Sequence, residues 1–377
     1  MILGPKQQIA DVTAMLRQFV ECESPSDDRA SVNRYVDLLA ETVQGDARVK
    51  TFSGGKSYGK HLRCEFILPG KKKTGQIMAL GHADTVWPVG TLRSMPFRNA
   101  QGRLWGPGIF DMKAGLVFFI FAMRALRERD VPVSRKVILQ VNSDEEIGSP
   151  SSRALTEENA RASSAVLVLE PSQGLDGRLK TSRKGVGDYT VTVHGRAAHA
   201  GLDFANGASA IVEMARQIEK IAAFTDLNRG ITVSPGIVRG GTRSNVIAAE
   251  CSAEIDVRIP KAKDSRYLER KFASLKPFDR RCTLEIVGGM NRPPLERTAG
   301  VQALFRKARA IAAELGVALE ESAAGGGSDG NFTAALGIPT LDGLGAVGEG
   351  AHASNESILI ERIPDRIALL SKLVAGL

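Results

Sequence analysis

Short apolar runs alternate with longer apolar or amphipathic stretches in the first half of the chain. Three of these runs, residues 76–80, 137–141 and 165–169, are each followed within two positions by polar or acidic residues. Residues 112–126 are apolar over a length that predicts a buried helix. This alternation is typical of an α/β layer fold, so we predict a mostly parallel sheet with helices on both faces.

From about residue 184 the pattern changes to longer alternating segments. Residues 186–194 alternate between apolar and polar side chains, and residues 208–222 have the periodicity of an amphipathic helix. The remaining segments predict two strands, a helix and a last strand, at residues 231–239, 248–259, 267–275 and 282–287. The order strand–helix–strand–strand–helix–strand is that of a ferredoxin-like α+β domain.

This second pattern is predicted to be an insertion, because the first pattern resumes after Pro294. Helices are expected at residues 301–315 and 363–373, with the end of a strand at residues 339–341. A chain of 377 residues is also long for one hydrophobic core. We therefore predict one domain from residues 1–183 and 295–377, and an inserted domain from residues 184–294.

Composition describes an ordinary globular protein, with 43% hydrophobic and 24% charged residues. The formal net charge of +8 raises the question of nucleic-acid binding. However, lysines and arginines are scattered, the one tight cluster at residues 71–73 lies between two apparent strands, and aromatic residues make up only 5%. Without a basic stripe carrying aromatics, we expect no nucleic-acid partner and instead a preference for small anionic substrates.

Cysteine usage and the apolar runs bear on the compartment. The four cysteines lie far apart and form no CxxC pair: Cys22, Cys64, Cys251 and Cys282. This spacing predicts neither a zinc knuckle nor a disulfide framework. Residues 1–16 lack the basic and apolar regions of a signal peptide, and the longest apolar run, residues 116–123, is too short to span a membrane. We expect a cytoplasmic protein with no membrane association.

Acidic and imidazole side chains gather after the predicted strands. Because the carboxyl ends of parallel strands share one edge of a sheet, side chains distant in sequence can converge there. The candidates are His82, Asp84, Asp111, Glu145, Glu146, Glu170 and His352. Imidazole and carboxylate ligands without thiolate suit Zn²⁺, Mn²⁺ or Co²⁺. A lone histidine in a loop is more often an ordinary surface residue, and residues 144–146 taken alone could be a solvated acidic turn.

Three segments in register resemble metallopeptidase family M20. They are GHADTV at residues 81–86, GPGIFDMKAG at residues 106–115 and DEEIGS at residues 144–149. Within the family they are most similar to the glutamate carboxypeptidase (carboxypeptidase G2-like) branch. The resemblance extends from about residue 10 to the end of the chain and includes the inserted segment.

The resemblance implies a site for two divalent metal ions, expected to be zinc, with Mn²⁺ or Co²⁺ as alternatives. His82 and Glu170 would bind one ion, Glu146 and His352 the other, and Asp111 would bridge them. Such ions lie about 3.5–4 Å apart and activate a water molecule. The resemblance also implies a cis peptide bond after Asp111.

Other roles follow from the same resemblance or from the neighbouring residues. Glu145, which binds no metal in this scheme, is the expected general base. Asp84 is expected to orient His82, because metal-bound histidines usually donate their second N–H to a carboxylate. Asp144 is expected to be solvated or structural, and His61 and His194 carry no motif, so we predict ordinary surface positions for those two histidines.

The inserted domain would carry further substrate contacts. His199, in a segment that resembles the family's lid histidine motif, is expected to reach the active site of a partner subunit and stabilise the oxyanion. Asn245 and Arg258 match contacts to the substrate carboxylate. Gly326 lies in a glycine-rich loop that lacks the spacing of a phosphate-binding loop and would line the substrate cleft.

These features lead to one main functional hypothesis. The chain would be a metallo-carboxypeptidase of the EC 3.4.17 type, a homodimer through its lid domain that releases a glutamate-like C-terminal amino acid. Its substrate would be a small peptide or an N-acyl amino acid with a free carboxylate. The alternative within the fold is an N-acyl-amino-acid deacylase acting on acetylornithine or succinyl-diaminopimelate. A non-catalytic binding protein is disfavoured because neither an expected ligand nor the base is missing.

Overall fold

The computed structural model describes residues 5–377, so the first four residues of the N-terminal segment considered above lie outside the described part. The chain forms two compact units. The first comprises the described part of Met1–Ser182 together with Arg297–Ala324 and Ser328–Leu377, and the second comprises Arg183–Glu296 and Gly325–Gly327. Each helix within residues 5–377 is too short or too polar to span a lipid bilayer.

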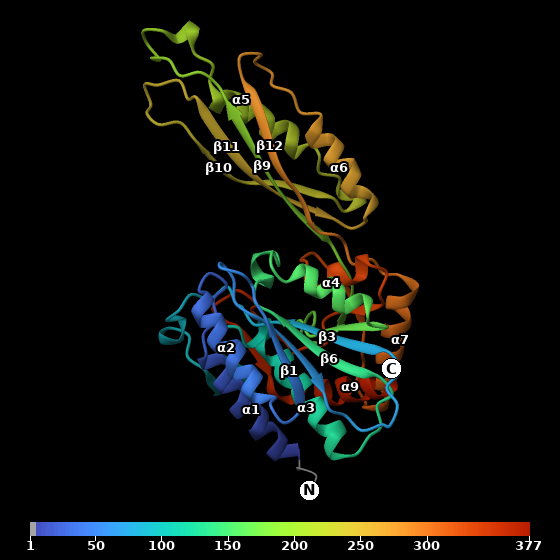
Figure 1. The fold of residues 1–377 in the computed structure, drawn as a ribbon. Helices are drawn as coiled ribbons and strands as arrows, with labels where there is room; N and C mark the ends of the chain where they lie inside the picture. Colours follow the sequence, from blue (N-terminus) through green and yellow to red (C-terminus); the bar gives the residue numbers. More distant parts are fainter. Residues whose placement is uncertain (1–4) are drawn as a thin grey trace. The chain divides into compact units, whose positions relative to one another are not determined.

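A six-stranded sheet forms the centre of the first unit (Figure 1). Its strands, in spatial order, are β1 (Ala47–Phe52), β2 (His61–Phe66), β6 (Lys136–Asn142), β3 (Gln76–His82), β7 (Ala165–Val168) and β14 (Thr340–Leu341). The pairs β6–β3, β3–β7 and β7–β14 are parallel. At one edge of the sheet, the pairs β1–β2 and β2–β6 are antiparallel. The predicted mostly parallel sheet is confirmed.

Helices cover both faces of this sheet, which is why all seven residues of β3 are buried. Ile77 and Ala79 pack into the larger core, while Met78 and Leu80 face the smaller one, as the two-residue period of a strand requires. The larger core receives α1 (Pro5–Glu21), α2 (Arg29–Thr42), α3 (Ala114–Glu128), α7 (Ala299–Glu314) and α9 (Ile363–Gly376). The smaller core receives α4 (Arg153–Arg161), and residues just after α8 (Gly330–Ala335) pack against it.

Two small sheets complete the described part of the first unit. One has the order β15 (Gly348–Glu349), β16 (Ser357–Leu359), β5 (Arg103–Trp105) and β4 (Arg98–Ala100). The pairing of β16 with β5 brings the loop that precedes β16, residues 350–356, to the segment that follows β5. A second sheet pairs β8 (Leu179–Arg183) with β13 (Glu321–Ala324).

The second unit has the predicted ferredoxin-like order. Along the chain it consists of β9 (Gly185–His194), α5 (Ala210–Ala222), β10 (Thr232–Gly240), β11 (Glu250–Ile259), α6 (Lys263–Ala273) and β12 (Thr283–Arg292). The strands form one antiparallel sheet in the order β10–β11–β9–β12. Both helices pack on one face, where Val191, Met214 and Phe272 belong to the same core. The opposite face carries the polar side chains of the alternating pattern.

Candidate metal centre

The candidate ligands lie at the carboxyl ends of neighbouring parallel strands. His82 is the last residue of β3 and pairs with Asn142, the last residue of β6, so Glu146 follows close behind in sequence. Glu170 comes two residues after Val168, the last residue of β7. The expected convergence at one edge of the sheet is thus what the strand register produces.

Two further candidates come from irregular segments. Asp111 lies in the turn Ile109–Lys113 between β5 and α3, where its φ of −114° and ψ of 93° interrupt the helix, and the Asp111–Met112 bond is cis. His352 lies in the loop before β16 and has a φ of +60°, a conformation that few residues other than glycine adopt.

The five side chains divide into two groups that share one carboxylate. In the first group, His82 Nε2 lies 3.2 Å from Asp111 Oδ1 and 3.5 Å from Glu170 Oε1. In the second, His352 Nε2 lies 3.3 Å from Asp111 Oδ2 and 3.2 Å from Glu146 Oε1. Asp111 therefore offers one oxygen to each group, as a bridging ligand must.

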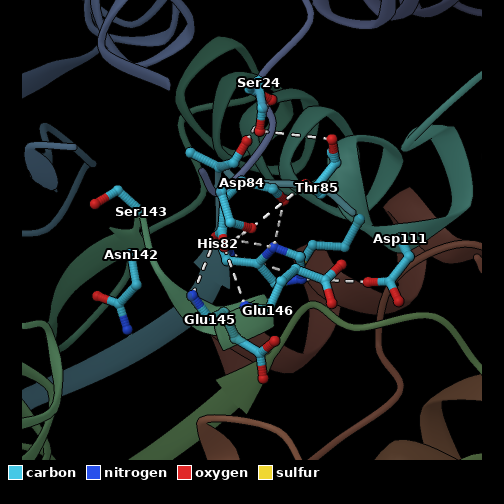
Figure 2. Close-up of polar contacts among 12 residues, drawn as sticks. Ser24, His82, Asp84, Thr85, Asp111, Asn142, Ser143, Glu145 and Glu146 are labelled. Carbon is cyan, nitrogen blue, oxygen red and sulfur yellow. Dashed lines mark hydrogen bonds and ion pairs between the residues drawn. The ribbon is translucent and has the colours of Figure 1, made fainter. Parts of the chain in front are cut away.

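The two groups are close enough to overlap around His82. Ligand atoms of His82, Asp111 and Glu146 all lie within 4.8 Å of one another, and so do those of His82, Glu145 and Glu170. Figure 2 shows His82 among Asp84, Asp111, Glu145 and Glu146. Glu145 is thus adjacent to the ligand set while belonging to neither of the two groups defined by Asp111.

The electrostatics of the cluster favour positive charge at its centre. Hydrogen bonds to Asp111 and Glu146 raise the pKa of His352 to about 10. Burial alone would lower the pKa of His82, but hydrogen bonds to Asp111, Asp84 and Glu170 raise it well above its usual range. Burial would raise the pKa of Asp111, yet its bonds to His352 and His82 hold that pKa below normal. Two imidazoles and three carboxylates in this arrangement fit divalent cations, whose binding displaces protons from the ligands.

Asp84 supports the cluster in a different way from the one expected. His82 Nδ1 lies 2.9 Å from the main-chain oxygen of Asp84 and 3.5 Å from its Oδ1, so the backbone carbonyl is the closer partner. The buried carboxylate instead accepts hydrogen bonds from the main-chain N–H groups of Glu145 (3.1 Å) and Glu146 (3.1 Å). Asp84 therefore connects the end of β3 to the acidic turn after β6.

The acidic turn is held by buried groups, and the alternatives of a solvated Asp144 and an exposed His61 are wrong. Asp144 is fully buried and its Oδ2 accepts hydrogen bonds from Ser151 N, Ser151 Oγ and Ser152 N, so it is structural and not solvated. His61 is 1% exposed and is not a surface residue. Its Nδ1 accepts the Ser143 N–H at 3.2 Å and its Nε2 lies 3.0 Å from Ser151 Oγ. His194, in contrast, lies between the exposed carboxylates of Glu250 and Glu285.

The remaining candidates, His199, Asn245, Arg258 and Gly326, lie in two separate regions of the second unit. His199 is exposed, and Asn245 lies beside it, because the Ala200 N–H donates to the Asn245 carbonyl oxygen at 3.0 Å. The Nδ1 of His199 accepts the N–H groups of Gly201 and Leu202, both at 3.1 Å. In a neutral imidazole with this pattern, Nε2 carries the proton and can donate it to a ligand.

Arg258 and Gly326 lie toward the other end of the same sheet. Arg258 pairs with Val186 at the start of β9, and the loop that contains Gly326 approaches Val186 through Gly327. His199 follows the other end of β9. Val186 and His194 alone are eight residues apart, which corresponds to roughly 26 Å along a strand. Within one chain, these two pairs of residues are therefore widely separated.

A mostly parallel α/β sheet with a two-group imidazole–carboxylate cluster at its carboxyl edge is an arrangement suited to a hydrolase that uses divalent metal ions. Comparison with known proteins specifies it further. Residues 78–376 match the model of peptidase family M20/M25/M40, and the chain belongs to this family. Carboxypeptidase G2 from Pseudomonas sp. (strain RS-16) is 27% identical over an alignment that covers 97% of this chain and 93% of that protein.

Other relatives carry different activities in their names. A succinyl-diaminopimelate desuccinylase from Cereibacter sphaeroides (strain ATCC 17025 / ATH 2.4.3) is 29% identical, over 78% of this chain and 81% of that protein. Among solved structures, the Bacillus subtilis YXEP protein, described as a dinuclear metal-binding peptidase of the M20 family, has a TM-score of 0.67. Its sequence identity is 15%, with 98% of both chains covered, so this likeness shows the fold alone.

Proposed function

We propose that this protein hydrolyses an amide bond at two divalent metal ions held by the two groups that share Asp111. The observation that carries the proposal is the distribution of the Asp111 oxygens, one beside His82 and Glu170 and the other beside Glu146 and His352. When bound, the ions would polarise the scissile carbonyl and lower the pKa of a water molecule. Zinc suits this ligand set best, and Mn²⁺ or Co²⁺ are alternatives.

Glu145 is the proposed general base. It takes a proton from the attacking water and passes it to the leaving amine, and its carboxylate lies beside His82 and Glu170. Its main-chain N–H is held by Asp84, which supports Asp84 as a residue that positions the base.

His199 is proposed to stabilise the oxyanion that forms during hydrolysis. Because its Nδ1 already accepts two main-chain N–H groups, Nε2–H is the donor it presents to a ligand. His199 and Asn245 lie far along the sheet from Arg258 and Gly326, so one substrate cannot touch all four residues of one chain. This separation supports a homodimer in which His199 and Asn245 act on a substrate bound by the partner subunit.

The lid domain, residues 184–294, is the proposed dimerisation domain. Its outer strand β10 has a free edge in the sheet order, and Ile237 and Val238 on it are 42% and 51% exposed. An edge strand with exposed apolar side chains favours pairing with a second copy. The remainder of the chain, residues 1–183 and 295–377, would be the catalytic domain, and a cytoplasmic location stays a prediction.

The proposed substrate is a small peptide or N-acyl amino acid whose free carboxylate is bound by Arg258. Arg258 Nε and Nη2 donate to the Asp256 carboxylate at 2.7–2.9 Å, which keeps the guanidinium oriented. Similarity to carboxypeptidase G2 favours release of a C-terminal residue. The resemblance of the sequence motifs to the glutamate carboxypeptidase branch favours a glutamate-like residue. Similarity to succinyl-diaminopimelate desuccinylases supports the second candidate, an N-acyl-amino-acid deacylase.

A hydrolysis screen distinguishes these candidates. Metal-stripped protein is reconstituted separately with Zn²⁺, Mn²⁺ and Co²⁺ and incubated with N-acyl and dipeptidyl substrates ending in Glu, Asp, Gly, Ala or an apolar residue. N-succinyl-diaminopimelate and N-acetylornithine form a second arm. We expect the highest kcat/KM for a substrate ending in glutamate, and absence of turnover across both arms with every metal would refute the proposed function.

A further inference from the structure

Glu356 is a carboxylate that is fully buried near the metal centre but is not one of its expected ligands. Both of its oxygens accept hydrogen bonds from N–H groups. The four donors are Trp87 Nε1 at 2.7 Å, Gly108 N at 2.8 Å, Phe110 N at 2.9 Å and Asp111 N at 3.0 Å. Three of these donors belong to the main chain of the turn that presents the bridging carboxylate.

The same residue also belongs to the loop that carries the second histidine. Glu356 follows His352 by four positions, and its own N–H donates to the Ala353 carbonyl oxygen at 3.0 Å. Its carbonyl oxygen accepts the Gly106 N–H at 3.3 Å. Main chain and side chain of one residue thus connect the segment at residues 106–111 to the loop at residues 352–356.

Neither segment is held by regular structure at the ligand itself. The backbone of Asp111 is non-helical, and His352 has a positive φ. The far end of the Asp111 turn is anchored separately, because Lys113 Nζ donates to the carbonyl oxygens of Phe19 and Cys22, both at 2.9 Å. Among the described residues, Glu356 therefore fixes the Asp111 end of the turn relative to the His352 loop.

The partners of the Glu356 side chain favour its anionic form. All four partners of the Glu356 side chain are donors, so a neutral carboxyl group or an amide would place one of its own hydrogens against an N–H group. Hydrogen bonds from several N–H groups offset part of the cost of burying the charge, and burial still raises the pKa of Glu356 to about 7. Replacement by an amide would break this pattern with little change in volume.

We propose that Glu356 is a positioning residue that sets the spacing between Asp111 and His352 and thereby the affinity for the ion bound by Glu146 and His352. This inference rests on the proposed two-metal function. The ion bound by His82 and Glu170 depends less on Glu356, because both of those ligands are placed by strand ends. Removal of a residue that orients metal ligands typically weakens metal binding by about 10–100-fold.

The test compares Glu356→Gln with Glu23→Gln. Glu23 is a matched control, because its carboxylate also accepts two main-chain N–H groups of the first unit, from Gly90 (2.8 Å) and Leu92 (3.0 Å). Metal-stripped full-length proteins are titrated with Zn²⁺ by calorimetry and with Co²⁺ by absorption spectroscopy. In Glu356→Gln we expect the weaker of the two equivalents to lose about 10–100-fold in affinity and the tighter one less than about threefold. Glu23→Gln should match the wild type at both.

Several results would overturn the inference. A folded Glu356→Gln protein, as judged by circular dichroism, with two unchanged affinities or with equal losses at both would refute it alone. If Glu356→Gln does not fold, Trp87→Phe removes one donor and keeps the carboxylate, and an unchanged second affinity in that variant would be equally decisive. Wild-type protein that takes up fewer than two ions would refute the proposed function itself and this inference with it.

Discussion

The two candidate ligand groups of the metal centre are built in contrasting ways. The side chains of His82 and Glu170 are 1% and 10% exposed and follow directly from the ends of β3 and β7. The side chain of His352 is 49% exposed and comes from a loop, although its partner Glu146 is only 8% exposed. One group is placed by the sheet, and the other depends on side chains that hold loops together.

This contrast teaches that a shared site need not be equally rigid throughout. Strand ends in a parallel sheet are fixed by the ladder on both sides, so their side chains need little additional support. The loop-borne group relies on the contacts of Glu356 and on Asp84, which holds the main chain of Glu146. We therefore expect the two ions to differ in affinity and in their sensitivity to substitution.

The largest expected effect comes from Glu145, which belongs to neither of the two ligand groups. Glu145→Gln should lower kcat by about 10³-fold or more, because it removes the general base, while both ions are retained. Steady-state kinetics and atomic emission analysis of metal content measure the two effects. Glu158→Gln on the exposed surface of α4 serves as the control and should leave both unchanged. Loss of one ion in Glu145→Gln would instead make Glu145 a ligand.

The next largest effect is a difference between the two groups in how much their histidines contribute to the free energy of unfolding. In metal-free protein, His82→Ala should lower the free energy of unfolding by roughly 3 kcal/mol, because it leaves buried carboxylates without their partner. His352→Ala should cost less than about 1 kcal/mol, because its side chain is half exposed. Urea denaturation monitored by circular dichroism measures both values. Equal losses in the two variants would abolish the contrast between a sheet-placed and a loop-placed group.

The same contrast explains how much could be predicted from the sequence. The ligands at strand ends can be predicted, because apolar runs predict β3, β6 and β7. His82, Glu146 and Glu170 then fall at one edge of the sheet. Asp111 and His352 were candidates by residue type and context, but no periodicity indicates the conformation of a turn or a loop, so their ligand roles rested on the motif resemblance. The pairing of Asp111 with both histidines became visible only in the structure.

The supporting residues were harder to predict, for a physical reason. Glu356 and His61 act through main-chain N–H groups of distant segments, and such partners leave no pattern in the sequence. The absence of a motif predicts an exposed His61, yet its burial depends on which element packs over it. Helix α6 begins at Lys263, four residues before the predicted start, since its polar first turn has no apolar period.

Stepwise removal of metal compares the affinities of the two ligand groups for their ions. When wild-type protein is dialysed against rising concentrations of a chelator, we expect one ion per chain to leave at a free-metal concentration at least about tenfold higher than the other. The half-exposed, loop-borne group should lose its ion first. Metal content per chain, with kcat measured in parallel, follows the two steps. Loss of both ions in a single step would show that the two groups bind as one unit.

The smallest expected effect concerns the ion pair between Arg297 and Glu321, which lies in neither ligand group and serves as a reference for both. Arg297 Nε and Nη2 donate to Glu321 at 2.7 Å, and these bonds lower the pKa of Glu321 from 4.5 to about 2. A lowered pKa stabilises the fold above about pH 4.5, and this contribution is lost as the pH falls toward 2.

Solvent screening limits the Glu321 contribution to less than about 1 kcal/mol, so Glu321→Gln should be slightly less stable than wild type at pH 7. The difference should shrink between pH 4.5 and pH 2, as measured by urea denaturation across that range. Glu320→Gln, at the neighbouring exposed position, is the control and should show no such dependence. Metal affinities should stay unchanged in Glu321→Gln. A change in either affinity would mean that general stability, and not local placement of ligands, distinguishes the two groups.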